Sequence, residues 1–251
     1  MRSLGREPEH HWAMAEKLGD DASGYTPSMS EAQIDQVRSW HERAYREGRA
    51  EGAADQTFDY LGVSVVVPPE VMPVNPMSHL LGEAVLVEVH EGERVLDMGT
   101  GSGVNAVLAA TRGADVLAVD TNPRAVDAAR ANAALNGVGD RLEVRHSDVF
   151  ANVKGTFDLI VFDPPFRWFR PRDLLESAMT DENYEAMTRF FREARQHLSP
   201  RGRMLIFFGT SGDLDYLRRL MVDCGFSAEV LAHDELIRDG WKVEYFTFRV
   251  T

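Results

Sequence analysis

The sequence predicts an α/β fold whose sheet has seven strands, mostly parallel, and ends in an antiparallel C-terminal hairpin. Three observations support this prediction. From residue 93 onward, short apolar runs alternate with helical stretches, and alternating β and α elements form a parallel sheet covered on both faces. Four of the runs end in or beside an aspartate. The last two runs, SAEVLA and VEYFTFRVT, have the pattern of antiparallel strands.

The core elements follow from the spacing of apolar residues and from the residues that punctuate them. The core strands are expected at residues 94–98, 115–120, 142–148, 157–163 and 203–209. The helices are expected at residues 104–113, 123–137, 183–198 and 214–224. Pro123 and Gly137 bound the second helix, because proline suits a first turn and glycine a helix end. The stretch Ser-Pro-Arg-Gly at 199–202 is expected to stop the third helix.

Two smaller units are expected before this core. Residues 30–48 have apolar side chains at helical spacing, and Ser30 can cap that helix. Residues 57–86 contain β-branched runs interrupted by four prolines, which predicts a hairpin on the larger domain, followed by a helix at 78–89. We therefore divide the chain into an N-terminal helical extension (1–56), a hairpin and helix (57–92) and an α/β core (93–251).

Composition limits the class of protein. The 251 residues are 44% hydrophobic and 27% charged, as in ordinary globular domains, and no run approaches the ~20 apolar residues that span a bilayer. The N-terminus lacks the apolar core of a signal peptide. The single cysteine, Cys224, favours a reducing, cytoplasmic location. A net charge of −13 argues against broad nucleic-acid binding, which requires neutralised phosphates.

The first core strand runs into LDMGTGSG, which contains Asp97, Gly99, Gly101 and Gly103. Glycines allow a backbone with positive φ and a close approach to a ligand. A dinucleotide fingerprint, G-x-G-x-x-G, would need a third glycine where Val104 stands. The pattern D-x-G-x-G-x-G instead resembles motif I of the class I S-adenosylmethionine-dependent methyltransferases.

The next two strands also end in acids. Asp120 lies 23 residues after Asp97, the spacing of an acid that binds ribose hydroxyls, although Asp120 or Asn122 could instead cap the following helix. In the family that motif I resembles, the acid at the position of Asp148 or its neighbour meets the adenine amino group; a surface acid is the alternative there. The expected cofactor-binding residues are Asp97, Gly99, Thr100, Gly101, Gly103, Asp120, Thr121, Asn122, Asp148, Val149 and Asp163.

The fourth strand ends in Asp163-Pro164-Pro165-Phe166, four candidate catalytic residues. This segment resembles the (D/N)-P-P-(Y/F/W) motif of methyltransferases that modify planar nitrogens. A conjugated nitrogen is a poor nucleophile because its lone pair is delocalised. The Asp163 carboxylate and the Pro164 carbonyl could bind its N–H groups and favour a tetrahedral nitrogen. The two prolines hold these acceptors rigidly, and Phe166 could stack on a planar substrate. The alternative is an ordinary turn after a strand.

From Thr57 to Thr251 the chain looks closest to the "small domain" methyltransferases, such as the release-factor glutamine (HemK-like) enzymes and guanine-N2 ribosomal enzymes. The resemblance implies a Rossmann-like class I fold, S-adenosyl-L-methionine as cofactor, S-adenosyl-L-homocysteine as product and no metal. The glutamine enzymes have Asn-Pro-Pro-Tyr, whereas this chain has Asp163 and Phe166. Asp-Pro-Pro-Phe is more usual where the target is a base amine.

The methyl acceptor stays open among three classes: a protein glutamine, a small metabolite, or an RNA base (guanine-N2 or adenine-N6). A dinucleotide oxidoreductase and an inert cofactor-binding adaptor are alternatives of other classes. The candidate substrate-binding residues come from the hairpin region and from the stretch after the Asp-Pro-Pro-Phe motif, whose aromatics could also simply pack as a lid. They are Asn75, Met77, Ser78, Arg167, Trp168, Phe169 and Arg170.

Overall fold

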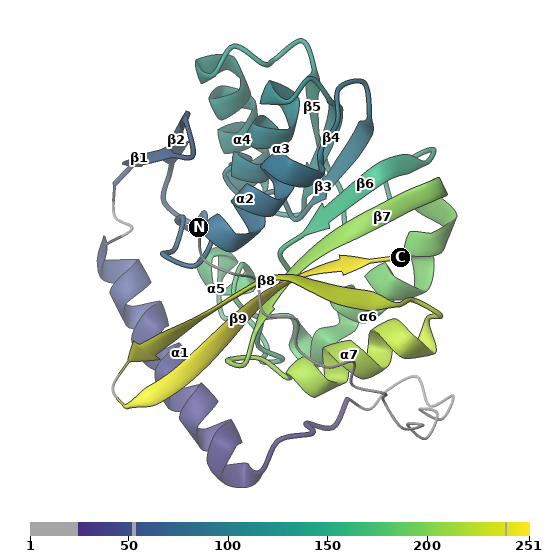
Figure 1. The fold of residues 1–251 in the computed structure, drawn as a ribbon. Helices are drawn as coiled ribbons and strands as arrows, with labels where there is room; N and C mark the ends of the chain where they lie inside the picture. The colour runs from purple at the N-terminus through teal and green to yellow at the C-terminus, as the bar shows by residue number, and fades with distance from the viewer. Residues whose placement is uncertain (1–24, 52–53, 239) are drawn as a thin grey trace, which may run out of the picture.

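The computed structural model describes residues 25–51, 54–238 and 240–251 (Figure 1). A sheet of seven strands has the order β5-β4-β3-β6-β7-β9-β8, which confirms the predicted fold class. Its strands are β3 (Arg94–Met98), β4 (Asp115–Asp120), β5 (Leu142–His146), β6 (Phe157–Phe162), β7 (Leu198–Gly209), β8 (Ala228–Arg238) and β9 (Trp241–Val250). The first five are parallel, and β9 runs antiparallel to both β7 and β8.

Helices cover both faces of the sheet (Figure 1). Along β6, Leu159 and Val161 face one apolar cluster, and Ile160 and Phe162 face the other, because successive side chains of a strand point to opposite faces. The first cluster contains α2 (His79–Glu88), α3 (Val104–Thr111) and α4 (Pro123–Leu135). The second contains α6 (Glu185–Ala194) and α7 (Leu214–Asp223). No helix in the described ranges is long and apolar enough to cross a membrane.

A hairpin of β1 (Gln56–Tyr60) and β2 (Val63–Val67) lies on the first layer, as expected. Two asparagines of α4, one turn apart, bind the free edge of β2. The Asn132 side chain accepts from Val66 N at 2.9 Å and donates to Val66 O at 2.8 Å. Asn136 does the same with Ser64 N and O, at 3.0 and 2.7 Å. The two amides therefore replace a neighbouring strand and fix the hairpin on the core.

The N-terminal helix α1 (Glu31–Glu51) begins with the expected cap, since Ser30 N and Oγ both donate to Gln33 Oε1. It packs beside the short α5 (Leu174–Ser177) and the tip of the β8–β9 hairpin (Figure 1). Val37 is buried, and Trp40 meets Trp241 edge to face with ring centres 5.3 Å apart. The remaining contacts are mostly polar, so α1 is held largely by side-chain hydrogen bonds and ion pairs.

The region 183–202 differs from the prediction of one helix stopped at 199–202. A 3₁₀ turn (Glu182–Tyr184) precedes α6, and Asn183 and Tyr184 have positive φ. After α6 the chain makes a second 3₁₀ turn (Arg195–His197) and enters β7 at Leu198, so residues 199–202 belong to a strand. Leu198 pairs with Phe157 and Arg203 with Leu159, so residues 199–202 have no partner in β6 and interrupt the regular pairing of β7. The third core strand likewise ends at His146, two residues early.

Replacing Asn132 with alanine is expected to destabilise the protein by about 2–3 kcal/mol, because buried backbone groups of Val66 and Ser102 lose their partners. The free energy of unfolding in urea measures this effect. Asp127→Ala, an exposed change on the same helix, is the control and should stay within about 0.5 kcal/mol of wild type. Equal stability of Asn132→Ala and the control would contradict the anchoring role.

Candidate active site

The candidate site lies at the carboxyl ends of the parallel strands. β3 has β4 on one side and β6 on the other, so the strand order reverses direction at β3. In open α/β sheets ligands bind in the crevice at such a point. The acids predicted at the ends of β3, β4 and β6 therefore share one edge, as the sequence predicted. Among the described residues, no group of His, Cys, Asp and Glu could hold a metal ion.

The glycine loop after β3 turns sharply into α3. Gly99, Gly101 and Gly103 all have positive φ, which strains any other residue type. At Gly103 a Cβ atom would lie 2.8 Å from Ala129 Cβ, so this glycine lets α3 and α4 approach each other. At Gly101 a Cβ atom would meet nothing within 4 Å. The loop thus leaves open space beside its backbone at Gly101, facing the strand ends.

Asp97 is buried and ties the loop to α3. Its Oδ2 accepts from Thr100 Oγ1 at 2.5 Å and from Ala106 N at 3.1 Å. Burial, together with the charge of Asp120, raises the pKa of Asp97 to about 7 in spite of these two bonds. One carboxylate oxygen, Oδ1, has no hydrogen bond among the described residues and stays free for a ligand.

Asp120 also organises backbone at the site. Its Oδ2 accepts from Gly101 N at 2.9 Å and its Oδ1 from Asn122 N at 2.8 Å. Burial raises its pKa. Asn122, not Asp120, caps α4, accepting from Arg124 N at 2.9 Å, while its Nδ2 donates to Glu70 O. Thr121 between them is exposed. A carboxylate has about four lone-pair sites, so Asp120 retains acceptor capacity.

Asp148 lies beyond the end of β5 and is exposed. Its carboxylate forms an ion pair with Arg189 Nη2 of α6 at 2.6 Å. The next residue, Val149, is buried and has a positive φ of 47°. The turn therefore directs the carboxylate toward solvent and Arg189, and Val149 toward the core.

Asp163 follows directly after β6 and differs from the other two buried acids. Its side chain is only partly exposed, and no described residue donates a hydrogen bond to it. Burial, and secondly the charge of Asp97, raises its pKa to about 7. The hydroxyl of Tyr60, in the hairpin, is buried without a partner, and burial and the charge of Asp163 raise its pKa. Tyr60 carried no sequence signal, because only the fold brings the hairpin to this strand end.

Pro164 is buried behind Asp163, and Pro165 is partly exposed. The Phe166 ring packs among Phe207, Phe208 and Tyr245. The carbonyl of Phe166 accepts from the Tyr184 hydroxyl at 2.5 Å, which fixes the backbone after the motif.

The other candidate residues separate into two places. Arg167 and Trp168 are buried, Phe169 is half-buried, and Arg170 is exposed with Glu182 3.9 Å away. In the hairpin region, Asn75 Oδ1 accepts from Met77 N at 2.8 Å. Ser78 Oγ accepts from Asn75 N at 3.2 Å. These three residues form the turn that opens α2.

Comparison with known proteins identifies the family. A model described as "methyltransferase small domain" matches residues 74–224. This chain belongs to the methyltransferase small domain family. The match covers the glycine loop, the acids at the strand ends and the Asp-Pro-Pro-Phe segment.

Curated relatives agree with this family. A putative protein N5-glutamine methyltransferase of Methanocaldococcus jannaschii is 31% identical over 68% of this chain and 88% of its own length. A release factor glutamine methyltransferase of Cereibacter sphaeroides is 35% identical over 58% and 56% of the two chains. A ribosomal RNA small subunit methyltransferase C of Chromohalobacter salexigens is 40% identical over 46% of this chain, which spans only 31% of that protein.

Solved structures share the fold. A ribosomal protein L11 methylase of Lactobacillus delbrueckii subsp. bulgaricus superimposes with a TM-score of 0.55 at 19% identity, over 77% of this chain and 97% of that one. A putative methyltransferase of Streptococcus mutans gives a TM-score of 0.60 at 16% identity, over 86% and 66% of the two chains. The fold is therefore the Rossmann-like methyltransferase fold.

This family is one of S-adenosylmethionine-dependent methyltransferases, and one putative methyltransferase with the same fold was solved as a complex with SAH. The site fits such a cofactor. The open face of the backbone at Gly101, the free oxygen of Asp97 and the remaining acceptor capacity of Asp120 lie together at the ends of β3 and β4. They offer acceptors for hydroxyl and ammonium groups beside a backbone that a ligand can approach closely.

Asp163→Asn is expected to stabilise the protein more at pH 8 than at pH 5, where only part of the effect is present. The pKa of Asp163 lies near 7 when folded and near ~3.9 when unfolded, so the folded state binds the extra proton between these values. The stabilising contribution of that proton is lost as pH rises through 7. Asparagine does not titrate, so its advantage should grow to on the order of 1–3 kcal/mol above pH 7. Urea unfolding from pH 5 to 8 measures it, with Asp127→Asn as the exposed control.

Proposed function

We propose that the protein transfers a methyl group from S-adenosylmethionine to a planar amide or amino nitrogen. The observation that carries this proposal is the Asp163 carboxylate, which is largely buried at the site and receives no hydrogen bond from the described residues. Burying such a group costs free energy unless a ligand satisfies it. An N–H group of the acceptor is the partner that fits an unpaired carboxylate.

Asp163 and the Pro164 carbonyl act as two acceptors for the N–H groups of that nitrogen. Their binding favours a tetrahedral nitrogen and localises its lone pair. Pro164 and Pro165 fix the backbone that carries both acceptors, so little reorganisation is needed during reaction. As the nitrogen forms its new bond to the methyl carbon, the carbon–sulfur bond would break and its electron pair would stay on the sulfur, leaving a neutral thioether. The nitrogen then carries the positive charge, and Asp163, with a pKa near 7, can accept the proton that it releases. Phe166 supplies an apolar wall for a planar group.

The cofactor supplies the methyl group as an electrophilic carbon on a sulfonium. We assign its binding to the glycine loop and to the acids at the strand ends. The assigned residues are Asp97, Gly99, Thr100, Gly101, Gly103, Asp120, Thr121, Asn122, Asp148, Val149 and Asp163. Two of these residues, Asp97 and Asp120, also position the glycine loop, because they accept hydrogen bonds from it and from the start of α3. We retain the division into residues 1–56, 57–92 and 93–251, with the acceptor bound where the three parts meet.

The acceptor is a protein glutamine or a small metabolite in this proposal. The names of two relatives favour glutamine, and the enclosed surroundings of Asp163 favour a small group entering the site. An RNA base is the alternative, favoured by the ribosomal RNA relative and by the exposed Arg170. An inert adaptor would bind the cofactor without any turnover.

Asp163→Ala is expected to lower kcat about 10²- to 10³-fold, because the nitrogen loses an acceptor that acts in the transition state. Transfer of labelled methyl groups from S-adenosylmethionine into protein, RNA and small-molecule fractions measures turnover. Binding of S-adenosylhomocysteine should change little. Asp127→Ala, exposed on α4, is the control. Turnover by Asp163→Ala comparable to wild type would refute the proposed mechanism.

Asp120→Asn is expected to weaken binding of S-adenosylhomocysteine about 10-fold or more, because hydrogen bonds to a charged group contribute roughly 1.5–3 kcal/mol. Isothermal titration calorimetry measures the affinity. Asparagine can still accept from one of the two backbone N–H groups, so the melting temperature should change little. A large loss of stability without a change in affinity would make Asp120 structural only.

A further inference from the structure

Arg167, the residue directly after the Asp-Pro-Pro-Phe motif, is a buried cation. Its relative exposure is 7%. The backbone around it is fixed, since Arg167 N donates to Met179 O and Arg167 O accepts from Asp181 N. Arginine almost never occurs buried unless it is paired. The partners of this guanidinium therefore need to be accounted for.

The guanidinium has only neutral partners. Its Nη2 donates to Ser211 Oγ at 3.3 Å, and its carbon lies 4.8 Å from the centre of the Trp40 ring and 5.9 Å from that of Phe166. Within the described part of the chain, no carboxylate lies within ion-pair distance. Its Nε is buried without any hydrogen-bond partner. Burial lowers the pKa of Arg167 to about 10, so the group still carries its charge at pH 7.

Two neighbouring groups are unsatisfied as well. Trp40 Nε1, on the ring that covers Arg167, is a buried donor without an acceptor. His41 Nδ1 is a buried ring nitrogen without a partner, and the positive charge of Arg167 contributes to a lowered His41 pKa. A buried cation beside an unpaired N–H donor is a site that an anion satisfies and that costs free energy without one.

We propose that the methyl acceptor is a small molecule that carries a carboxylate, and that Arg167 and Trp40 bind this carboxylate. The inference rests on the proposed function, because it identifies the substrate class of the same site. The planar guanidinium matches a planar carboxylate and forms strong charge-assisted hydrogen bonds with it.

The size of the site limits the acceptor. Arg167 is four residues from Asp163, so their Cα atoms lie within about 14 Å of each other. A cavity of about 670 Å³ lies between α1 and residues 168–183, and its lining includes His41 but neither Arg167 nor Trp40. A polynucleotide requires an open basic surface instead, whereas Arg167 is enclosed and the chain carries a net charge of −13.

Thermal unfolding in sodium formate against sodium chloride, at equal ionic strength, tests the anion site directly. Formate is the smallest carboxylate and should raise the wild-type melting temperature by about 2 °C or more, because a ligand that binds only the folded state stabilises it. Arg167→Met should lose this response. Its melting temperature in chloride should be no lower than that of wild type, since methionine removes an unpaired buried charge. Arg112→Met, a change at the exposed arginine that follows α3, is the control and should respond like wild type.

An equal formate response in wild type and Arg167→Met overturns the proposal, and so does the absence of any response in wild type. A response to phosphate but not to formate assigns the site to a phosphoryl group and overturns the carboxylate. A marked loss of stability in Arg167→Met with the formate response retained makes Arg167 a structural residue.

Labelled methyl transfer into a cell extract separates this inference from the proposed function. Label in a small product retained on an anion-exchange column, reduced 10-fold or more by Arg167→Met, supports the inference. Label in a neutral small molecule, a protein or an RNA overturns it and leaves N-methyl transfer standing. Label in no fraction refutes the proposed function itself.

Discussion

Parallel pairing of β3 with β6 forces two carboxylates together at one buried edge. Asp97 pairs with Val161 and Met98 with Phe162, so Asp163 emerges just beyond the end of β3. Each carboxylate lies in a poorly solvated place, and the charge of Asp97 adds to the raised pKa of Asp163. Burying both carboxylates lowers the free energy of unfolding. Hydrogen bonds then give the two acids different properties: Asp97 is fixed by Thr100 and Ala106, whereas Asp163 has no donor.

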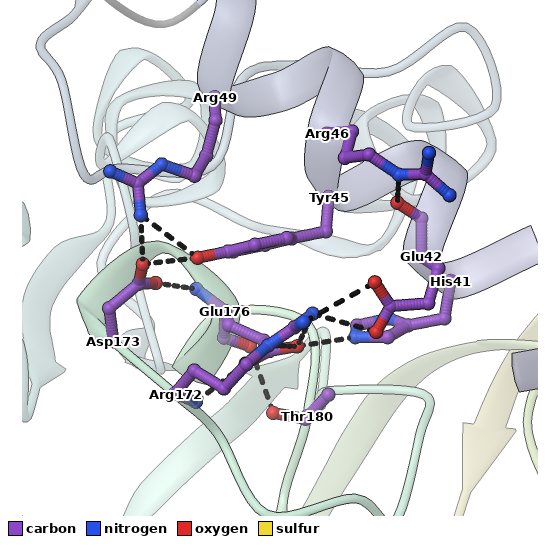
Figure 2. A network of polar contacts seen from close by, with 9 residues as sticks. All are labelled: His41, Glu42, Tyr45, Arg46, Arg49, Arg172, Asp173, Glu176 and Thr180. Atoms are coloured by element: carbon purple, nitrogen blue, oxygen red, sulfur yellow. Dashed lines mark hydrogen bonds and ion pairs between the residues drawn. The ribbon is translucent and has the colours of Figure 1, made fainter.

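A second polar network holds the N-terminal helix α1 against the segment that contains α5 (Figure 2). The carboxylate of Glu176 accepts from Arg172 and lies 2.7 Å from His41 Nε2, and these partners lower the pKa of Glu176 to about 2 against the effect of burial. Arg49 and Tyr45 both reach Asp173 at the start of α5. This network fixes the helix that carries Trp40, whose ring lies over the Arg167 guanidinium.

The sequence predicted the parts of this site that local patterns determine. We located β3, β4 and β6 and the turn after each from the spacing of apolar residues, the aspartates at the strand ends and the positions of glycines. These features depend only on residues that are neighbours in the sequence. Other features depend on segments 50 to 130 residues apart, so no local pattern reveals them. They are the binding of β2 by Asn132 and Asn136, the unpaired hydroxyl of Tyr60 and the position of Trp40 over Arg167. The helix before β7 ends at Ala194, earlier than predicted, whereas the Pro-Gly segment at 199–202 does interrupt the pairing of β7 with β6.

The spacing of Asp163 and Arg167 gives the motif a second role. The two side chains are opposite in charge, buried and only four residues apart, yet they do not pair. In a flexible segment they would form an ion pair with each other and leave nothing for a ligand. Two prolines and a phenylalanine whose carbonyl is fixed by Tyr184 keep them separate. A rigid segment with an unpaired acceptor at one end and an unpaired donor at the other complements a molecule with an N–H group at one end and an anion at the other. On this argument the prolines position both ends of the acceptor, and not only the nitrogen that is methylated.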